Sequence, residues 1–295
     1  MPPPVRQNGG MLKKLWSAMR APVVVAIPDP LWDRTIAELA CLHRLAPVER
    51  ARLRELAGRL LAEKQMAGAA GLELTAAMQV SIAAQASLPI LNLGLEWYRG
   101  WSGIVVYPDE FLVPRRVTDD AGVVHETTET LSGEAWQNGP LVLSWRDADA
   151  AAPRPADGAP QQVACNVVIH EFTHKLDLLD GPANGVPPFD PHLHPDLDPN
   201  TWMLALDDAL ERMDSELALI AGELPEGMDP DAPEADRYYA HLPLDPYATA
   251  DEGEFFAVSS EAFFITPRRL RDAFPQWYGQ LGQFFRQDPL REAGH

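Results

Sequence analysis

The stretch Val167-Val-Ile-His-Glu-Phe-Thr-His-Lys-Leu-Asp-Leu-Leu179 decides most of what this sequence predicts. It lies in the strongest helical pattern of the chain, which we expect to run from Val163 to about Leu179. His170 and His174 are four residues apart, so both imidazoles fall on one helical face and can reach a single ion. Apolar residues on both sides of the pair predict a buried helix, where unpaired polar groups are costly unless they bind something.

The five residues from His170 to His174 match the pattern H-E-x-x-H, in which two histidines on a helix hold zinc. Zinc suits two neutral imidazoles and a carboxylate, with water in the remaining open position. Glu171 can then face that water and act as a general base. The competing interpretations are two ordinary core histidines and a structural zinc site. A structural site favours cysteine, and neither Cys41 nor Cys165 is placed to help.

A third metal ligand has several candidates shortly after the motif. Asp177 and Asp180 stand where the metzincin pattern requires glycine and histidine, which excludes that family. Both lie close to the same helix, so they suit a supporting or helix-ending role better than ligation. His192 and His194 lie in a Pro-rich loop at 181–200 and remain alternatives.

A later predicted helix, Glu252–Ile265, offers better ligands. Glu254 and Glu261 are seven residues apart and therefore fall on nearly the same helical face. Glu254 could instead complete a capping box with Asp251 as N-cap. Glu261 could instead be a supporting carboxylate that orients a histidine. The residues alone leave this choice open.

The rest of the chain predicts an α+β fold, because a helical part is followed by strands and then by helices again. We expect a flexible tail at 1–30 and a single domain at 31–292, with a helical lead-in at 31–100 and a catalytic part at 101–292. Pro/Ala/Asp-rich stretches at 146–162 and 222–243 read as exposed loops. The remaining predicted helices are Pro47–Leu61, Leu74–Ala86, Trp202–Leu219 and Pro275–Arg286, and the strands are Gly103–Pro108, Phe111–Val117, Val123–Thr130 and Gly139–Trp145.

Charge and composition exclude several function classes. The 295 residues include 24 basic and 43 acidic ones, a net charge of −19, which argues against direct binding of nucleic acid or anionic membranes. The same charge favours basic or amine-bearing ligands. No run approaches the ~18 apolar residues of a membrane span. Two cysteines and the lack of a signal-like apolar run predict a cytoplasmic protein.

Several stretches besides the metal motif resemble the Mlc titration factor family of zinc metallopeptidases, also called glucose-regulated metallopeptidases. The resemblance covers roughly residues 30–292. The matching stretches are Leu93-Gly-Leu-Glu-Trp-Tyr-Arg-Gly100, Ile104-Val-Val-Tyr-Pro108, Leu131-Ser-Gly-Glu-Ala-Trp-Gln-Asn-Gly-Pro-Leu-Val-Leu-Ser-Trp145, Val168-Ile-His-Glu-Phe-Thr-His-Lys-Leu-Asp177, Gly185-Val-Pro187 and Asp245-Pro-Tyr-Ala-Thr-Ala-Asp-Glu-Gly-Glu-Phe-Phe-Ala-Val-Ser-Ser-Glu-Ala-Phe-Phe264.

The family is similar in its catalytic core to the anthrax lethal factor protease, and this likeness implies a zincin-like domain. It implies that Glu254, which opens a Glu-Phe-Phe-Ala run, is the third zinc ligand, leaving Asp177 and Glu261 as supporting candidates. It also implies that Tyr247 assists catalysis by donating a hydrogen bond to the developing oxyanion.

The strand Pro140–Trp145 would be the edge strand of a zincin sheet. Its residues Leu141, Val142 and Leu143 would then pair with an extended peptide substrate.

The resemblance implies a zinc-dependent, aminopeptidase-like enzyme with one Zn²⁺ per chain and a peptide or protein substrate. The alternative is a regulatory protein that sequesters a transcriptional repressor of the Mlc type, with proteolysis secondary.

Overall fold

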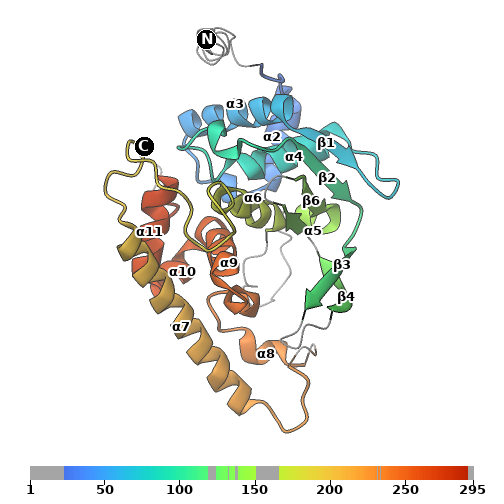
Figure 1. The fold of residues 1–295 in the computed structure, drawn as a ribbon. Helices are drawn as coiled ribbons and strands as arrows, with labels where there is room; N and C mark the ends of the chain where they lie inside the picture. The colour runs from blue at the N-terminus through green and yellow to red at the C-terminus, as the bar shows by residue number, and fades with distance from the viewer. Residues whose placement is uncertain are drawn as a thin grey trace, which may run out of the picture.

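The computed structural model describes residues 23–118, 124–131, 133–136, 139–150, 166–230, 232 and 234–291 (Figure 1). Its elements follow in the order α2 (Asp29–Glu38), η1 (Ala40–Leu42), α3 (Pro47–Glu63), β1 (Gln65–Gly68), α4 (Ala76–Ser87), η2 (Leu95–Tyr98), β2 (Gly103–Tyr107), β3 (Phe111–Thr118), β4 (Val124–Leu131), β5 (Gly133–Ala135), β6 (Leu141–Ser144), α5 (Trp145–Ala150), α6 (Val167–Asp177), α7 (Pro199–Glu223), α8 (Asp236–Tyr239), η3 (Pro246–Thr249), α9 (Glu252–Ile265), α10 (Pro267–Ala273) and α11 (Pro275–Phe285).

Four strands form one sheet in the order β1-β2-β6-β5, and β3 and β4 form a separate antiparallel hairpin. β1, β2 and β6 run parallel, with Ile104 opposite Leu141, whereas β5 runs antiparallel to β6, with Glu134 opposite Val142. The long β3–β4 hairpin projects from the end of this sheet (Figure 1). The predicted α+β class is confirmed, with a sheet that is mostly parallel.

The predicted edge strand is wrong in its place within the sheet. Leu141, Val142 and Leu143 lie in β6, which is paired on one side with β2 and on the other with β5. β6 is buried along its whole length, as expected for an inner strand that packs on helices. The edge that ends the sheet next to α6 is β5.

The N-terminal helices pack around the first part of the sheet. α3 packs on α4 and β1, and α2 packs on α4 (Figure 1). The helical lead-in expected at 31–100 is interrupted by β1, a short strand of Gln, Met, Ala and Gly. The predicted tail is also wrong at 23–30, because Ile27 is buried and the backbone of Val25 donates to Gly58 O. Residues 1–22 lie outside the described residues.

Two buried helices cross in the centre of the molecule. α6 begins at the N-cap Asn166, whose side chain accepts from Ile169 N, and packs against β5, β6, α4 and α9. α9 has the predicted bounds and is buried from Gly253 to Phe264 apart from Glu254. A helix that is apolar on all sides belongs in the interior, so the fold encloses α9 with α6, α7, α10 and α11.

The two predicted loops are partly helical. α5 occupies 145–150, and the remainder of the predicted 146–162 loop lies outside the described residues. α7 extends from residue 199 to residue 223, beyond the predicted Trp202–Leu219, and the short helix α8 lies within the second predicted loop. None of the helices in the described ranges is long and apolar enough to cross a membrane.

The turn after α6 is tied to α7 and α9 through Gly185. Its carbonyl accepts a 2.8 Å hydrogen bond from the indole of Trp202, a fully buried side chain on α7. Gly185 has φ +73°, and a Cβ added there would lie 2.5 Å from Glu252 O. Only glycine fits this position without strain or displacement of the start of α9.

We predict that Gly185→Ala lowers the free energy of unfolding by about 2 kcal/mol or more, through left-handed backbone strain and the clash with α9. Gly222→Ala is the matched control, because Gly222 is exposed on α7 with nothing within 4 Å of an added Cβ. This control should be neutral or stabilising by up to ~1 kcal/mol. Urea unfolding of the two variants measures both values, and equal stability would contradict the role assigned to Gly185.

Candidate metal centre

Three side chains from two helices converge where α6 faces α9. His170 and His174 come from successive turns of α6, and Glu254 comes from the first turn of α9. The two Nε2 atoms are 3.1 Å apart, and Glu254 Oε2 lies 3.1 Å from that of His170 and 3.4 Å from that of His174. One ligand atom from each residue lies within 4.8 Å of the others. The sequence-predicted ligands are therefore brought together.

The donor set fits a tetrahedral cation such as zinc. Bonds of about 2.0–2.1 Å separate tetrahedral ligands by about 3.3–3.4 Å, close to the spacing of these three atoms. Glu254 Oε2 is buried and makes no aligned hydrogen bond to either ring, although both rings are close. Three potential ligand atoms 3.1–3.4 Å apart, one of them a buried carboxylate oxygen without a hydrogen bond, are arranged for an ion.

Glu261 supports His170 from behind. Its Oε1 lies 2.8 Å from His170 Nδ1, and its Oε2 accepts a short hydrogen bond from Asn166 N. The bond to Nδ1 leaves Nε2 free for a metal, which is the usual way a carboxylate orients a ligating imidazole. The side-chain amide of Asn166 in turn donates a 2.8 Å hydrogen bond to Gln85 Oε1 on α4, so the N-terminal helices help to fix this arrangement.

Charge within the metal-free cluster shifts two of its pKa values. Burial lowers the pKa of His170, but the carboxylates of Glu254 and Glu261 outweigh it and raise this pKa well above 6.5. Burial would raise the pKa of Glu254, but the two imidazoles beside it hold it well below its ordinary value. A metal binds neutral imidazole, so binding must displace the proton from His170.

Glu171 directly follows His170 on α6, near enough to His170, His174 and Glu254 to feel their charges, and its carboxyl group lies against Gly133 of β5. An added Cβ on Gly133 would lie 2.2 Å from its Oε1, so this strand approaches the carboxyl group as closely as a glycine allows. Burial raises the pKa of Glu171 to about 7, and its Oε2 is buried without a hydrogen-bond partner. An unpartnered carboxyl group with a pKa near neutrality is suited to accept and return a proton.

Tyr247 stands beside the third ligand. It lies in η3, whose N-cap Asp245 accepts from the backbone of Tyr247. The phenol is 54% exposed, and partial burial together with the neighbouring Glu254 carboxylate raises its pKa to about 12. It therefore keeps its proton at neutral pH and can donate a hydrogen bond to a group bound at the centre.

The other predicted candidates have structural partners away from the three ligand atoms. Asp177 Oδ2 accepts from Asn184 N and Gly185 N, and so folds the turn after α6. His194 is buried against the ring of Phe284 and lies 2.9 Å from its carbonyl oxygen. Neither residue belongs to the converging group, and neither do Asp180 and His192.

Sequence reasoning missed Lys175, the residue directly after the motif. It is buried, and its Nζ donates to Trp136 O at 2.5 Å and to Gly139 O at 3.1 Å. These bonds fasten the segment between β5 and β6 to α6. Burial lowers the pKa of Lys175 to about 8. The available signal was a lysine inside an otherwise buried helix, which requires partners.

Comparison with known proteins places the chain in a family. The family model described as glucose-regulated metallo-peptidase M90 matches residues 14–286. The chain belongs to the M90 family of metallo-peptidases. It is 34% identical over 261 residues to Mlc titration factor A of Klebsiella pneumoniae (strain 342), covering 88% of this chain and 87% of that protein. It is also 34% identical to the Mlc titration factor A of Salmonella arizonae over 280 residues (95% and 98%) and of Escherichia fergusonii over 281 residues (95% and 93%).

Membership of the M90 family confirms the resemblance seen in the sequence, and a metallo-peptidase family implies a metal. The His170, His174 and Glu254 group is a possible site for it. The residues that surround this group give two testable predictions.

We predict that Gly133→Ala pushes the Glu171 carboxyl group from its place, because the new methyl group overlaps three atoms of that side chain. Peptidase activity should fall about tenfold or more, while bound metal stays at the wild-type level. Gly103→Ala in β2 is the control, since its Cβ would meet only Pro140 at an ordinary 3.5 Å. Full activity of Gly133→Ala would show that β5 does not position Glu171.

We predict that metal stabilises the protein more as the pH rises from about 6 to 8, because fewer protons then compete for His170. The metal-free protein should lose stability over the same window. The folded-state pKa values of His170 and Glu171 both lie above their unfolded values, so folding takes up protons that are lost as the pH rises. Melting temperatures with and without zinc test this, and a pH-independent shift on metal addition would contradict it.

Proposed function

We propose that this protein is a zinc-dependent peptidase of the H-E-x-x-H type, with one Zn²⁺ per chain held by His170, His174 and Glu254. The observation that carries the proposal is the convergence of these three ligand atoms beside the buried, unpartnered carboxyl group of Glu171. The M90 family match supports the reaction class. The domain that carries this activity spans residues 31–292 in our proposal, and we place it in the cytoplasm.

Zinc bound at this site would supply a Lewis acid that lowers the pKa of a water molecule towards ~7. Glu171 accepts a proton from the attacking water as its oxygen bonds to the peptide carbonyl carbon. The same carboxyl group then returns the proton to the leaving nitrogen as the C–N bond breaks. The Tyr247 phenol donates a hydrogen bond to the oxyanion that develops on the carbonyl oxygen.

The substrate is a peptide or protein that adds to the sheet edge at β5. β5 replaces β6 in this role because β6 is already paired on both sides. The net charge of −19 favours a substrate with a free amine, which supports an aminopeptidase-like preference. Asp177 supports the site indirectly through the turn at Gly185, and Glu261 supports it directly through His170.

We predict that Glu171→Gln lowers peptide hydrolysis by at least about a hundredfold, because the amide cannot accept the proton. Zinc content should be unchanged, because Glu171 is not among the three ligands. The control is Glu252→Gln, an exposed glutamate in the first turn of α9. Metal analysis and peptide-library cleavage, each with and without a chelator, measure the two quantities. Wild-type activity of Glu171→Gln would overturn the mechanism.

The names of the relatives favour a second candidate function. They are called Mlc titration factor A, which connects those proteins with Mlc. For this chain the corresponding proposal is a regulatory protein that sequesters a repressor of the Mlc type, with proteolysis secondary. A pull-down with wild type and Glu171→Gln separates the two roles, since capture by both proteins would support binding that is independent of catalysis.

A further inference from the structure

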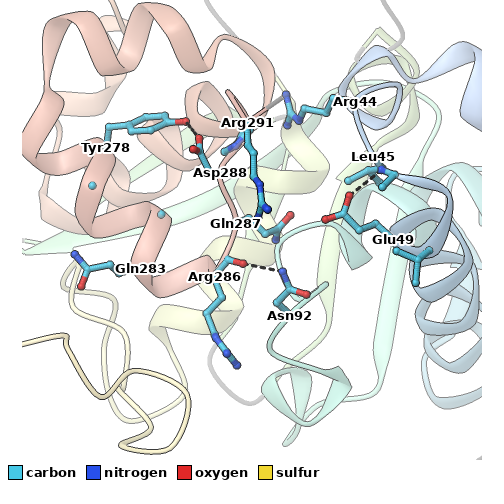
Figure 2. A pocket seen from close by; sticks show the side chains of 15 residues that line it. Arg44, Leu45, Glu49, Asn92, Tyr278, Gln283, Arg286, Gln287, Asp288 and Arg291 are labelled. Atoms are coloured by element: carbon cyan, nitrogen blue, oxygen red, sulfur yellow. Dashed lines mark hydrogen bonds between the residues drawn. The ribbon is translucent and has the colours of Figure 1, made fainter. Parts of the chain in front are cut away.

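A cavity lies between the N-terminal helices and the C-terminal segment, and it shares no residue with the metal centre. Its volume is about 650 Å³. One wall comes from the start of α3 and the residues before it, and the other comes from α11 and the segment that follows it (Figure 2). The charged side chains that line it are those of Arg44, Glu49, Arg286, Asp288 and Arg291. Cavities of about 300–1,000 Å³ are the usual size for small-molecule sites.

The acidic groups of the cavity are already occupied. Glu49 accepts a 2.8 Å hydrogen bond from Ala46 N and so caps α3. Asp288 accepts from the Tyr278 hydroxyl at 2.8 Å and from Leu290 N at 3.0 Å (Figure 2). Neither carboxylate forms an ion pair with a cavity arginine in the part of the chain that the structure describes. Both carboxylates keep their charge, but they are outnumbered by the three arginines of the cavity, Arg44, Arg286 and Arg291.

Arg44 is the most constrained of these charges. Its half-buried guanidinium donates 2.5 Å to Phe264 O, a neutral carbonyl. The titratable groups that face it are the Cys41 thiol, whose pKa burial raises to about 11, and the Tyr278 phenol, whose pKa burial and Asp288 raise. Both stay neutral at neutral pH. A half-buried cation without an anionic partner is costly, and an anion in the cavity would relieve that cost.

The cavity has open space beside Gly279, one of its lining residues. Gly279 lies within α11, and a Cβ added there would meet nothing within 4 Å. Glycine inside a helix costs about 1 kcal/mol relative to alanine, and no packing contact within 4 Å requires it here. Arg291 also lines the cavity, and no described group forms an ion pair with it. Arg286 extends away from Arg44 at the far edge (Figure 2).

We propose that this cavity binds a small molecule through a phosphate or carboxylate group, which Arg44 and Arg291 hold. Guanidinium groups bind both oxyanions through paired, charge-assisted hydrogen bonds. Leu45 and Val48 line the cavity beside them and can contact an uncharged part of the ligand. The proposal does not depend on the peptidase function, because no residue of the metal centre takes part.

Calorimetric titration of the zinc-loaded protein with inorganic phosphate, and separately with succinate, tests this site. Ionic strength is held constant with sodium chloride. We expect saturable binding of at least one anion, and the one that binds identifies the preferred group. Arg44→Gln and Arg291→Gln should each weaken binding about tenfold or more, through the loss of a charged hydrogen-bond donor. Repeating the titration on chelator-treated protein removes any anion binding to the metal.

Three further variants complete the test. Gly279→Leu should weaken binding by placing a bulky side chain in the cavity, whereas Gly279→Ala should preserve it. Arg34→Gln, on the exposed surface of α2 outside the cavity, is the charge-matched control and should bind as wild type does. If Arg44→Gln does not fold, Arg291→Gln and Gly279→Leu still decide the question. Absence of saturable binding by both anions, or equal affinity in Gly279→Leu and wild type, would overturn the proposal.

Discussion

The hydrogen bond between His170 Nδ1 and Glu261 Oε1 joins the two helices on which the rest of the site depends. It fixes the ring of His170, and because Glu261 lies two turns after Glu254 on α9, it also sets the height at which Glu254 meets the ring. A bond of 2.8 Å between the buried Glu261 and the partly buried His170 tolerates little sliding of one helix along the other. The ligand triangle is thus a consequence of helix packing rather than of loop geometry.

The burial of this bond explains why α9 is so apolar elsewhere. Four phenylalanines, Phe255, Phe256, Phe263 and Phe264, are completely buried on it, and they fill the space between α6, α7 and α11. Large aromatic contacts stabilise the fold, whereas charged groups at the centre destabilise it unless they are paired. Asp251 adds to the precision, because it caps α9 through the backbone of Glu254 itself. The ligand and the helix start are therefore positioned by a single residue.

The parts of this design that are local in the chain could be predicted from the sequence. The i, i+4 histidines required only helical periodicity, and the bounds of α9 followed from its apolar pattern and its N-cap. The choice of Glu254 over Glu261 required the family resemblance, because both face α6 and differ only in which one meets Nε2.

The long-range pairing of the strands was not predictable from the sequence. β1 and β5 are short strands of Gln-Met-Ala-Gly and Gly-Glu-Ala, which lack β-branched and aromatic residues, and without β5 the strand β6 was wrongly placed at an edge.

α9 also joins the metal centre physically to the cavity lined by Arg44. Its first turn carries Glu254, and near its last turn the Phe264 carbonyl accepts the hydrogen bond of Arg44. A rigid helix transmits a displacement only if both ends have two arrangements of similar free energy. A metal bound at the centre would hold the end at Glu254, whereas the end at Phe264 is held by buried aromatic packing and by the bond to half-buried Arg44. An anion that paired with Arg44 would strengthen or compete with the hydrogen bond from Arg44 to Phe264 O. If the anion thereby changed the affinity of the protein for metal, the metal would change the affinity for the anion by the same factor.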